Sequence, residues 1–146
     1  MNIAGVSKVA LGLGCDRGTP VETIARAVAE ALSAAGLEAA QVQAVASITL
    51  KADEVGLLEF AATQGWTLRF YSPEQLATVS VPNPSETVRR YTGTPSVAEA
   101  AALLAAGAEQ SQLIVEKHKL RGPDGRNATV SVALIAENMK PDPVAT

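Results

Sequence analysis

The chain has 146 residues, 47% of them hydrophobic and 18% charged, which predicts one globular domain rather than a disordered chain. Aromatic residues make up 3% and the net charge is −3, so the stacking platforms and basic face of a nucleic-acid-binding protein are both lacking. A single cysteine excludes an intramolecular disulfide, and neither a signal peptide nor a membrane-spanning stretch is visible, so we expect a soluble cytoplasmic protein.

The first predicted elements are a strand over residues 6–13 and a helix that follows it directly. Small and branched apolar residues fill this strand, which we expect to stop in a tight turn at Gly12-Leu13-Gly14. The helix start is predicted at Thr19-Pro20-Val21-Glu22, with Thr19 as the N-cap and Glu22 completing a capping box. Gly36 is expected to end this helix in a left-handed conformation.

A second strand over residues 42–50 runs into Lys51-Ala52-Asp53-Glu54. Asp53 is expected to cap a helix that ends near Gly65, and a short strand over 67–71 follows. Four residues of that helix are expected to face inward: Leu57, Leu58, Ala61 and Ala62. The alternation of strands and helices predicts parallel βαβ units.

Three later segments repeat the chemistry of a capped helix start: Ser72-Pro73-Glu74-Gln75, Asn83-Pro84-Ser85-Glu86 and Ser96-Val97-Ala98-Glu99. The last of these helices is expected to end at Gly107. Two strands over 112–117 and 128–136 then flank a turn and should pair antiparallel. The prediction is a single three-layer-like α/β domain over residues 1–139, with a mostly parallel sheet flanked by helices, an antiparallel C-terminal strand pair and a disordered tail over 140–146.

The loop from Gly12 to Thr19 is a candidate anion site. It joins a strand to a capped helix, where backbone amides and the positive end of the helix dipole can hold a carboxylate or a phosphate. The same glycines also fit a plain tight turn. Their spacing matches neither the dinucleotide fingerprint nor the P-loop.

Cys15 is a candidate nucleophile. Arg17 and the neighbouring helix start would favour the thiolate form of this cysteine. However, His118 is the single histidine of the chain, and no third group to orient it is recognisable. A lone cysteine is more often a small buried apolar residue, so both interpretations stay open.

Two further sets of charged residues are candidates. Lys51, Asp53 and Glu54 stand at the end of a predicted parallel strand, where ligands bind, although a helix cap with first-turn charges explains the two carboxylates equally well. Five basic residues concentrate near the predicted hairpin and could face an anion or simply be solvated: Lys117, His118, Lys119, Arg121 and Arg126. No residues have metal-ligand spacing, so we predict no metal and no cofactor.

Five segments taken together resemble one family over nearly the whole chain, in order: 12–19, 50–57, 81–85, 93–100 and 127–130. They are similar to the CobE/CbiG C-terminal family of cobalamin biosynthesis, and the chain looks closest to its stand-alone members. The resemblance implies that the N-terminal part of the longer relatives, which are associated with opening a precorrin lactone, is missing here. Hydrolysis is therefore not carried over.

The resemblance implies a corrinoid ligand fringed with carboxylates, such as a precorrin or hydrogenobyrinic acid. It assigns the anion-binding features to this ligand, and the candidate binding residues are Gly14, Cys15, Arg17, Gly18, Thr19, Lys51, Asp53, Glu54, Gly93, Thr94, Ser96, Lys117, Asn127 and Thr129. Leu13, Leu57 and Ala128 are expected to contribute to a groove for the apolar macrocycle. The long spacer between Lys119 and Asn127 argues against a shared ligand-facing role for Lys117 and Lys119.

Three functions remain open from the sequence. The first is a protein that binds or carries a polycarboxylate precorrin or hydrogenobyrinic acid between enzymes. The alternative is a hydrolase or isomerase acting on a precorrin lactone through Asp53, Glu54 or Cys15. The third is an interaction module that recruits another enzyme of the corrin pathway.

Overall fold

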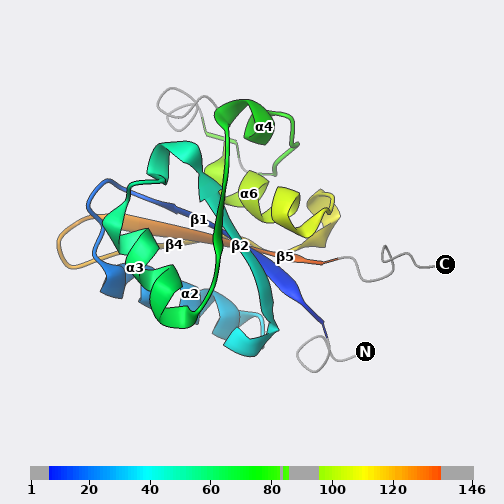
Figure 1. Ribbon diagram of the computed structural model, residues 1–146. Helices are drawn as coiled ribbons and strands as arrows, with labels where there is room; N and C mark the ends of the chain where they lie inside the picture. The colour runs from blue at the N-terminus through cyan, green and yellow to red at the C-terminus, as the bar shows by residue number, and fades with distance from the viewer. Residues whose placement is uncertain (1–6, 83, 86–95, 136–146) are drawn as a thin grey trace.

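The computed structural model describes residues 7–82, 84–85 and 96–135, which form an open five-stranded sheet with helices on both faces (Figure 1). The helices and strands are β1 (Val9–Cys15), α2 (Val21–Ala34), β2 (Val42–Ile48), α3 (Val55–Gln64), β3 (Leu68–Tyr71), α4 (Pro73–Ala77), α6 (Val97–Ala106), β4 (Leu113–Arg121) and β5 (Asn127–Leu134). Short 3-10 turns precede β2 (Ala39–Gln41), follow β2 (Thr49–Lys51) and precede β4 (Gln110–Gln112).

The sheet has the strand order β3-β2-β1-β5-β4. Strands β1, β2 and β3 run parallel, whereas β5 runs antiparallel to both of its neighbours, β1 and β4. The predicted fold class is therefore confirmed, including the antiparallel pair at the C-terminal end. Because β1, β2 and β4 point the same way, their carboxyl ends and the amino end of β5 meet at one edge of the sheet.

The two faces of the sheet are covered by different kinds of side chain. Larger residues, among them Leu11 and Val130, pack against α2 and α3 in the main core. On the opposite face, alanines such as Ala10 and Ala133 pack against α6 (Figure 1). The short helix α4 packs against α6 through Leu76. Small side chains on this second face let α6 approach the sheet closely.

Gly12 is the position where this close approach is tightest. A Cβ atom placed there would lie 1.8 Å from the carbonyl oxygen of Ala98 and 2.6 Å from the backbone nitrogen of Ala102. Gly12 therefore belongs to the body of β1, where it pairs with Ser131, and the predicted tight turn at residues 12–14 is wrong. The glycine is needed for helix packing rather than for turning the chain.

The helix starts agree only partly with the capping predictions. Helix α4 has the predicted capping box, in which Ser72 Oγ accepts a hydrogen bond from Gln75 N while Ser72 N donates to Gln75 Oε1. Helix α2 instead has Pro20 as its N-cap, and α3 has Glu54, both without a side-chain cap. Thr19 and Asp53 are thus not the caps, because their side chains are engaged in the contacts described below.

The helix ends follow the predictions more closely, since Gly36, Gly65 and Gly107 all have positive φ angles just after α2, α3 and α6. The inward face of α3 differs in part from the prediction. Leu57 and Ala61 are buried, but Leu58 is 42% exposed and Ala62 is exposed, while Phe60 fills the core instead. Of the helix start predicted at Asn83-Pro84-Ser85-Glu86, the structure describes Pro84 and Ser85, and neither is helical. Asn83, Glu86 and the tail from residue 140 lie outside the described residues.

The C-terminal hairpin forms as predicted but its strands begin and end at different residues, with β4 extending to Arg121 and β5 beginning at Asn127. The register of β4 against β5 shifts twice between Leu113 and His118. Among the described residues, no helix has both the length and the apolar character needed to cross a bilayer.

Candidate functional site

A cleft of about 460 Å³ lies at the edge of the sheet where β1, β2 and β4 end and β5 begins. Gly14 and Cys15 reach it from β1, Lys51 from the turn after β2, and Asn127 and Thr129 from β5. The amino end of α6 closes one wall through Ser96, Val97 and Ala98. In open α/β sheets, this edge is the usual place for a ligand.

The cleft is rich in positive charge. Of the described residues that line it, four are cations, and Asp16 carries the one carboxylate; the cations are Arg17, Lys51, Lys117 and Lys119. Lys51 and Lys119 make no ion pair with any described residue. A chain with a net charge of −3 thus concentrates unneutralised cations at one place, which favours a ligand with several negative groups.

Arg17 is held by the segment that follows β2. Its Nη1 lies 2.9 Å from Asp53 Oδ1 and 3.1 Å from Glu54 Oε1, and its Nη2 donates to the carbonyl oxygen of Leu50 at 2.9 Å. The hydrogen bond to Asp53 raises the pKa of the Arg17 guanidinium and lowers the pKa of the Asp53 carboxyl. Since these contacts occupy both terminal nitrogens, Arg17 ties the loop after β1 to the turn that carries Lys51.

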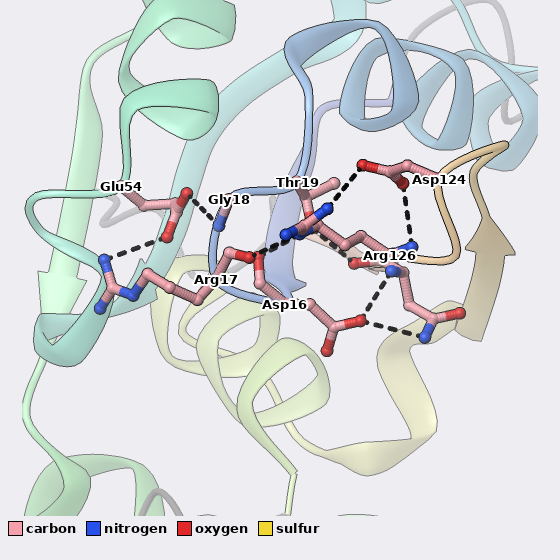
Figure 2. A network of polar contacts seen from close by, with 8 residues as sticks. Asp16, Arg17, Gly18, Thr19, Glu54, Asp124 and Arg126 are labelled. Atoms are coloured by element: carbon pink, nitrogen blue, oxygen red, sulfur yellow. Dashed lines mark hydrogen bonds and ion pairs between the residues drawn. The ribbon is translucent and has the colours of Figure 1, made fainter.

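The loop after β1 is fixed further by its own backbone groups (Figure 2). Gly18 N donates to the other oxygen of the buried Glu54 carboxylate at 2.9 Å, and the Thr19 hydroxyl donates to the carbonyl oxygen of Asp16 at 2.7 Å. Arg126 Nε donates to the carbonyl oxygen of Arg17 at 3.0 Å. These amide and hydroxyl groups therefore serve the loop itself, and the predicted anion cradle at Gly18 and Thr19 does not face the cleft.

Asp16 and Asn127 join the same loop to the start of β5. The backbone nitrogen and the side-chain amide of Asn127 both donate to Asp16 Oδ2, at 2.8 and 3.1 Å. Asp16 N donates in turn to the carbonyl oxygen of Asn127 at 3.0 Å. The carboxylate of the cleft is thereby engaged by two donors, which reduces its repulsion of an incoming anion.

Ser96 is notable among the residues of the cleft because its buried hydroxyl has no hydrogen-bond partner in the described part of the chain. It is the N-cap residue of α6, yet its side chain makes no capping hydrogen bond, so the predicted capping box with Glu99 does not form. Ser96 is 1% exposed, and its Oγ has no hydrogen-bond partner among the described residues. The first amides of α6 likewise lack acceptors within the helix, as at every helix start.

Cys15 lines the cleft but also packs against the main core. Burial raises the pKa of its thiol to about 11, and the nearby Lys51 offsets only part of this increase. The predicted electropositive activation is therefore wrong, because burial outweighs the attraction of the neighbouring cation. At neutral pH this cysteine is a thiol and a poor nucleophile.

The structure brings most of the predicted site residues together. Eight of them line the cleft: Gly14, Cys15, Arg17, Lys51, Ser96, Lys117, Asn127 and Thr129. Four others do not line it and instead make the contacts that position Arg17 and the loop: Gly18, Thr19, Asp53 and Glu54. Gly93 and Thr94 lie outside the described residues.

Several cleft residues were missed by the sequence interpretation. Lys119 lines the cleft together with Lys117, so the long spacer does not separate them, because alternate residues of a strand share one face. The apolar walls come from Ile48, Val97 and Ala98, whereas Leu13, Leu57 and Ala128 are buried in the main core and do not line the cleft. The alternation of β4 would have indicated Lys119. Of the α6 wall, the resemblance implied Ser96, but nothing in the sequence indicated Val97 and Ala98.

Among the described residues, no group of three or more histidine, cysteine or acidic side chains could hold a metal ion. The single histidine, His118, lies on the other face of β4, where its Nε2 is 2.8 Å from Glu30 Oε1 of α2.

Comparison with known proteins gives a consistent result. Residues 9–133 match the family described as Cobalamin synthesis G C-terminus. The chain is 40% identical over 109 residues to Protein CobE of Sinorhizobium sp, a match that covers 73% of this chain and 70% of that protein. The crystal structure of CobE, a protein from the cobalamin biosynthetic pathway, superposes with a TM-score of 0.75 at 32% identity, covering 92% of this chain and 94% of that one.

A longer relative matches only through one part of its length. The chain is 40% identical over 127 residues to the Cobalt-precorrin-5A hydrolase of Priestia megaterium, covering 87% of this chain. The matched part is 32% of the hydrolase, so the chain spans about a third of that relative.

Proposed function

This chain belongs to the Cobalamin synthesis G C-terminus family, and from that premise we propose that its cleft binds a corrin intermediate through several carboxylates at once. As a cobalamin biosynthesis protein, it works among compounds whose macrocycle carries acetate and propionate arms. The proposed ligand is a precorrin or hydrogenobyrinic acid, held for transfer to the next enzyme.

The observation that carries the proposal is the unneutralised charge at the cleft. Lys51 and Lys119 come from opposite sides of the sheet edge, one after β2 and one on β4, and neither makes an ion pair with a described residue. Two cations so arranged suit a ligand whose negative groups are spread around a large ring. Ile48 and Val97 supply apolar surface between them.

The size of the cleft supports a protein that carries the corrin intermediate rather than enclosing it. Its volume of about 460 Å³ is in the usual range for a small-molecule pocket. A tetrapyrrole macrocycle with its carboxylate arms is larger than this space, so part of the ligand would remain outside and accessible to a second protein.

A hydrolase is the second candidate, favoured by the similarity to a cobalt-precorrin-5A hydrolase. The described residues offer it little support. Asp53 and Glu54 do not line the cleft and are paired with Arg17, while the high pKa of Cys15 keeps that group protonated. Turnover of a lactone-bearing precorrin by the purified protein, abolished by substitution of Cys15, Asp53 or Glu54, would establish this candidate instead.

The proposal is tested by titrating the protein with hydrogenobyrinic acid and following the absorption spectrum of the macrocycle. We expect binding that weakens as salt is raised, because screening acts on the lysine–carboxylate attraction. Lys51→Met and Lys119→Met should each lower the affinity about two- to fivefold, as for partly exposed ion pairs. The double variant should lose about tenfold if the two contacts are independent.

Lys8→Met is the matched control. Lys8 is exposed just before β1, at the opposite edge of the sheet, so its removal changes the net charge equally without touching the cleft. A ligand bound equally well by the control and by the double variant would contradict the proposal. No spectral change at high micromolar protein would contradict it altogether.

A further inference from the structure

The amino end of α6 forms one wall of the cleft, where a buried hydroxyl and the first backbone amides of a helix lie beside two apolar side chains. Ser96, Val97 and Ala98 line the cleft, and the first backbone amides of a helix have no acceptor within the helix. The helix dipole adds partial positive charge at the same place. A helix start of this kind is common in proteins, so a second feature is needed to point to a ligand.

That second feature is the hydroxyl of Ser96. Its Oγ is buried and has no hydrogen-bond partner among the described residues, although serine at an N-cap usually bonds to an amide of the first turn. A buried polar group without a partner costs free energy, and such groups in native proteins call for an explanation. A ligand oxygen in the cleft would supply the missing partner.

Two other buried serines, Ser47 and Ser131, have hydroxyls that are paired within the protein. Ser47 Oγ donates to the carbonyl oxygen of Leu13 at 2.7 Å, and Ser131 Oγ donates to the carbonyl oxygen of Glu116. Both hydroxyls satisfy backbone acceptors within the protein. Ser96 lies instead at the boundary between α6 and the cleft, with no acceptor provided among the described residues.

We infer that the amino end of α6 is a subsite for one ionised carboxylate arm of the ligand, which accepts hydrogen bonds from Ser96 Oγ and first-turn amides. This inference rests on the proposed function and assigns one arm of the macrocycle to a defined place. Lys51 and Lys119 then hold other arms at the mouth of the cleft. Glu99, the acidic residue in the first turn of α6, does not line the cleft.

A site built from donors distinguishes a carboxylate from a carboxamide. A carboxylate offers only acceptors and carries the charge that the helix dipole favours, and charge-assisted hydrogen bonds are about twice as strong as neutral ones. The NH₂ group of a carboxamide would meet donors. The subsite therefore selects the acid form over an amidated form of the same macrocycle.

The test combines Ser96→Ala with two ligands, hydrogenobyrinic acid and the same compound with its arms converted to carboxamides. For the acid, we expect Ser96→Ala to lower affinity about tenfold, the usual effect of losing one hydrogen bond to a charged group. For the carboxamide form, the same substitution should cost only about threefold, because the remaining bond is neutral. The unliganded variant should unfold at an equal or higher temperature than the wild type, because a buried unpartnered hydroxyl has been removed.

Ser47→Ala is the matched control, since it makes the same chemical change at a buried serine whose hydroxyl is already paired. It should lower the unfolding temperature and leave both affinities unchanged. An unchanged affinity of Ser96→Ala for the acid would overturn the inference while the proposed function stood. Equal losses for the two ligands, or a destabilised unliganded Ser96→Ala, would also overturn it, and failure of the wild type to bind the acid would overturn the proposed function itself.

Discussion

Adding one methyl group at Gly12 tests whether the packing of α6 sets the shape of the cleft. The Cβ of Gly12→Ala would lie 1.8 Å from the carbonyl oxygen of Ala98, and real Cβ atoms essentially never approach another atom within 3.0 Å. The helix must therefore move away from β1 by about 1 Å or more. Since the contact is with backbone, no side-chain rotation can relieve it.

The expected cost follows from overpacking in a tight interface. Inserted methyl groups typically cost about 1–3 kcal/mol, and a clash with a helix backbone belongs at the upper end, so we expect about 3 kcal/mol. Displacing α6 also moves Ser96, Val97 and Ala98 relative to Lys51 and Lys119, which should weaken binding of hydrogenobyrinic acid. Urea unfolding measures the first effect and spectroscopic titration the second.

Gly14→Ala is the control, two residues along the same strand. A Cβ there would meet only the Cβ of Thr129, at an ordinary 4.0 Å, and Gly14 has no positive φ angle. The control should keep wild-type stability or gain about 0.5 kcal/mol from the reduced entropy of the unfolded chain. If Gly12→Ala proved as stable as Gly14→Ala, the packing argument for α6 would be refuted.

Three further substitutions or reagents test other contacts. Glu54→Ala should destabilise the protein by about 1–3 kcal/mol in urea unfolding, because it leaves the Gly18 amide without its acceptor. The control Glu59→Ala, on the exposed face of α3, should have little effect on stability. Equal losses of stability in the two variants would count against the loop contact. Burial raises the pKa of Cys15 from 9.0 to about 11, so iodoacetamide should label Cys15 in the folded protein about 100-fold more slowly at pH 7.5 than in the unfolded chain. Fast labelling of the folded protein would contradict the burial of this side chain. The hydrogen bond with His118, together with Arg26, lowers the pKa of Glu30. The stabilising effect of this carboxylate is therefore present above the unfolded pKa and is lost as the pH falls through the lower folded pKa. The stability difference between wild type and Glu30→Gln should be seen at pH 7 and shrink as acid protonates the folded carboxylate, and a difference that grew over that protonation would have the wrong sign.

The sequence allowed much of the fold to be predicted, because strand and helix periodicity and the glycines after helices are local signals. Gly36, Gly65 and Gly107 have the left-handed conformation expected of them. Gly12 was interpreted as a turn because its real role depends on α6, which lies far away in sequence. No local pattern reports how closely a distant helix approaches a strand.

The site was predictable to the extent that strand ends determine it. Lys51 was expected at the end of a parallel strand and lines the cleft, because the carboxyl ends of parallel strands meet at one edge. Asn127, which only the family resemblance implied, lines the same cleft from the start of β5, and the role of both residues in binding stays a prediction. The state of Cys15 was not, since burial depends on the tertiary structure and opposes the neighbouring cation. The same holds for Ser96, whose sequence context predicts a capping box that the folded helix does not form.

The measurement that bears most directly on the account is a titration of the isotope-labelled protein with hydrogenobyrinic acid, followed by amide chemical shifts. We predict shifts concentrated at Gly14, Lys51, the start of α6, Lys119 and Thr129, with α2 and the outer face of α3 unaffected. Shifts centred on α2 and α3, with a silent α6 start, would contradict the placement of a carboxylate-binding cleft at this edge of the sheet.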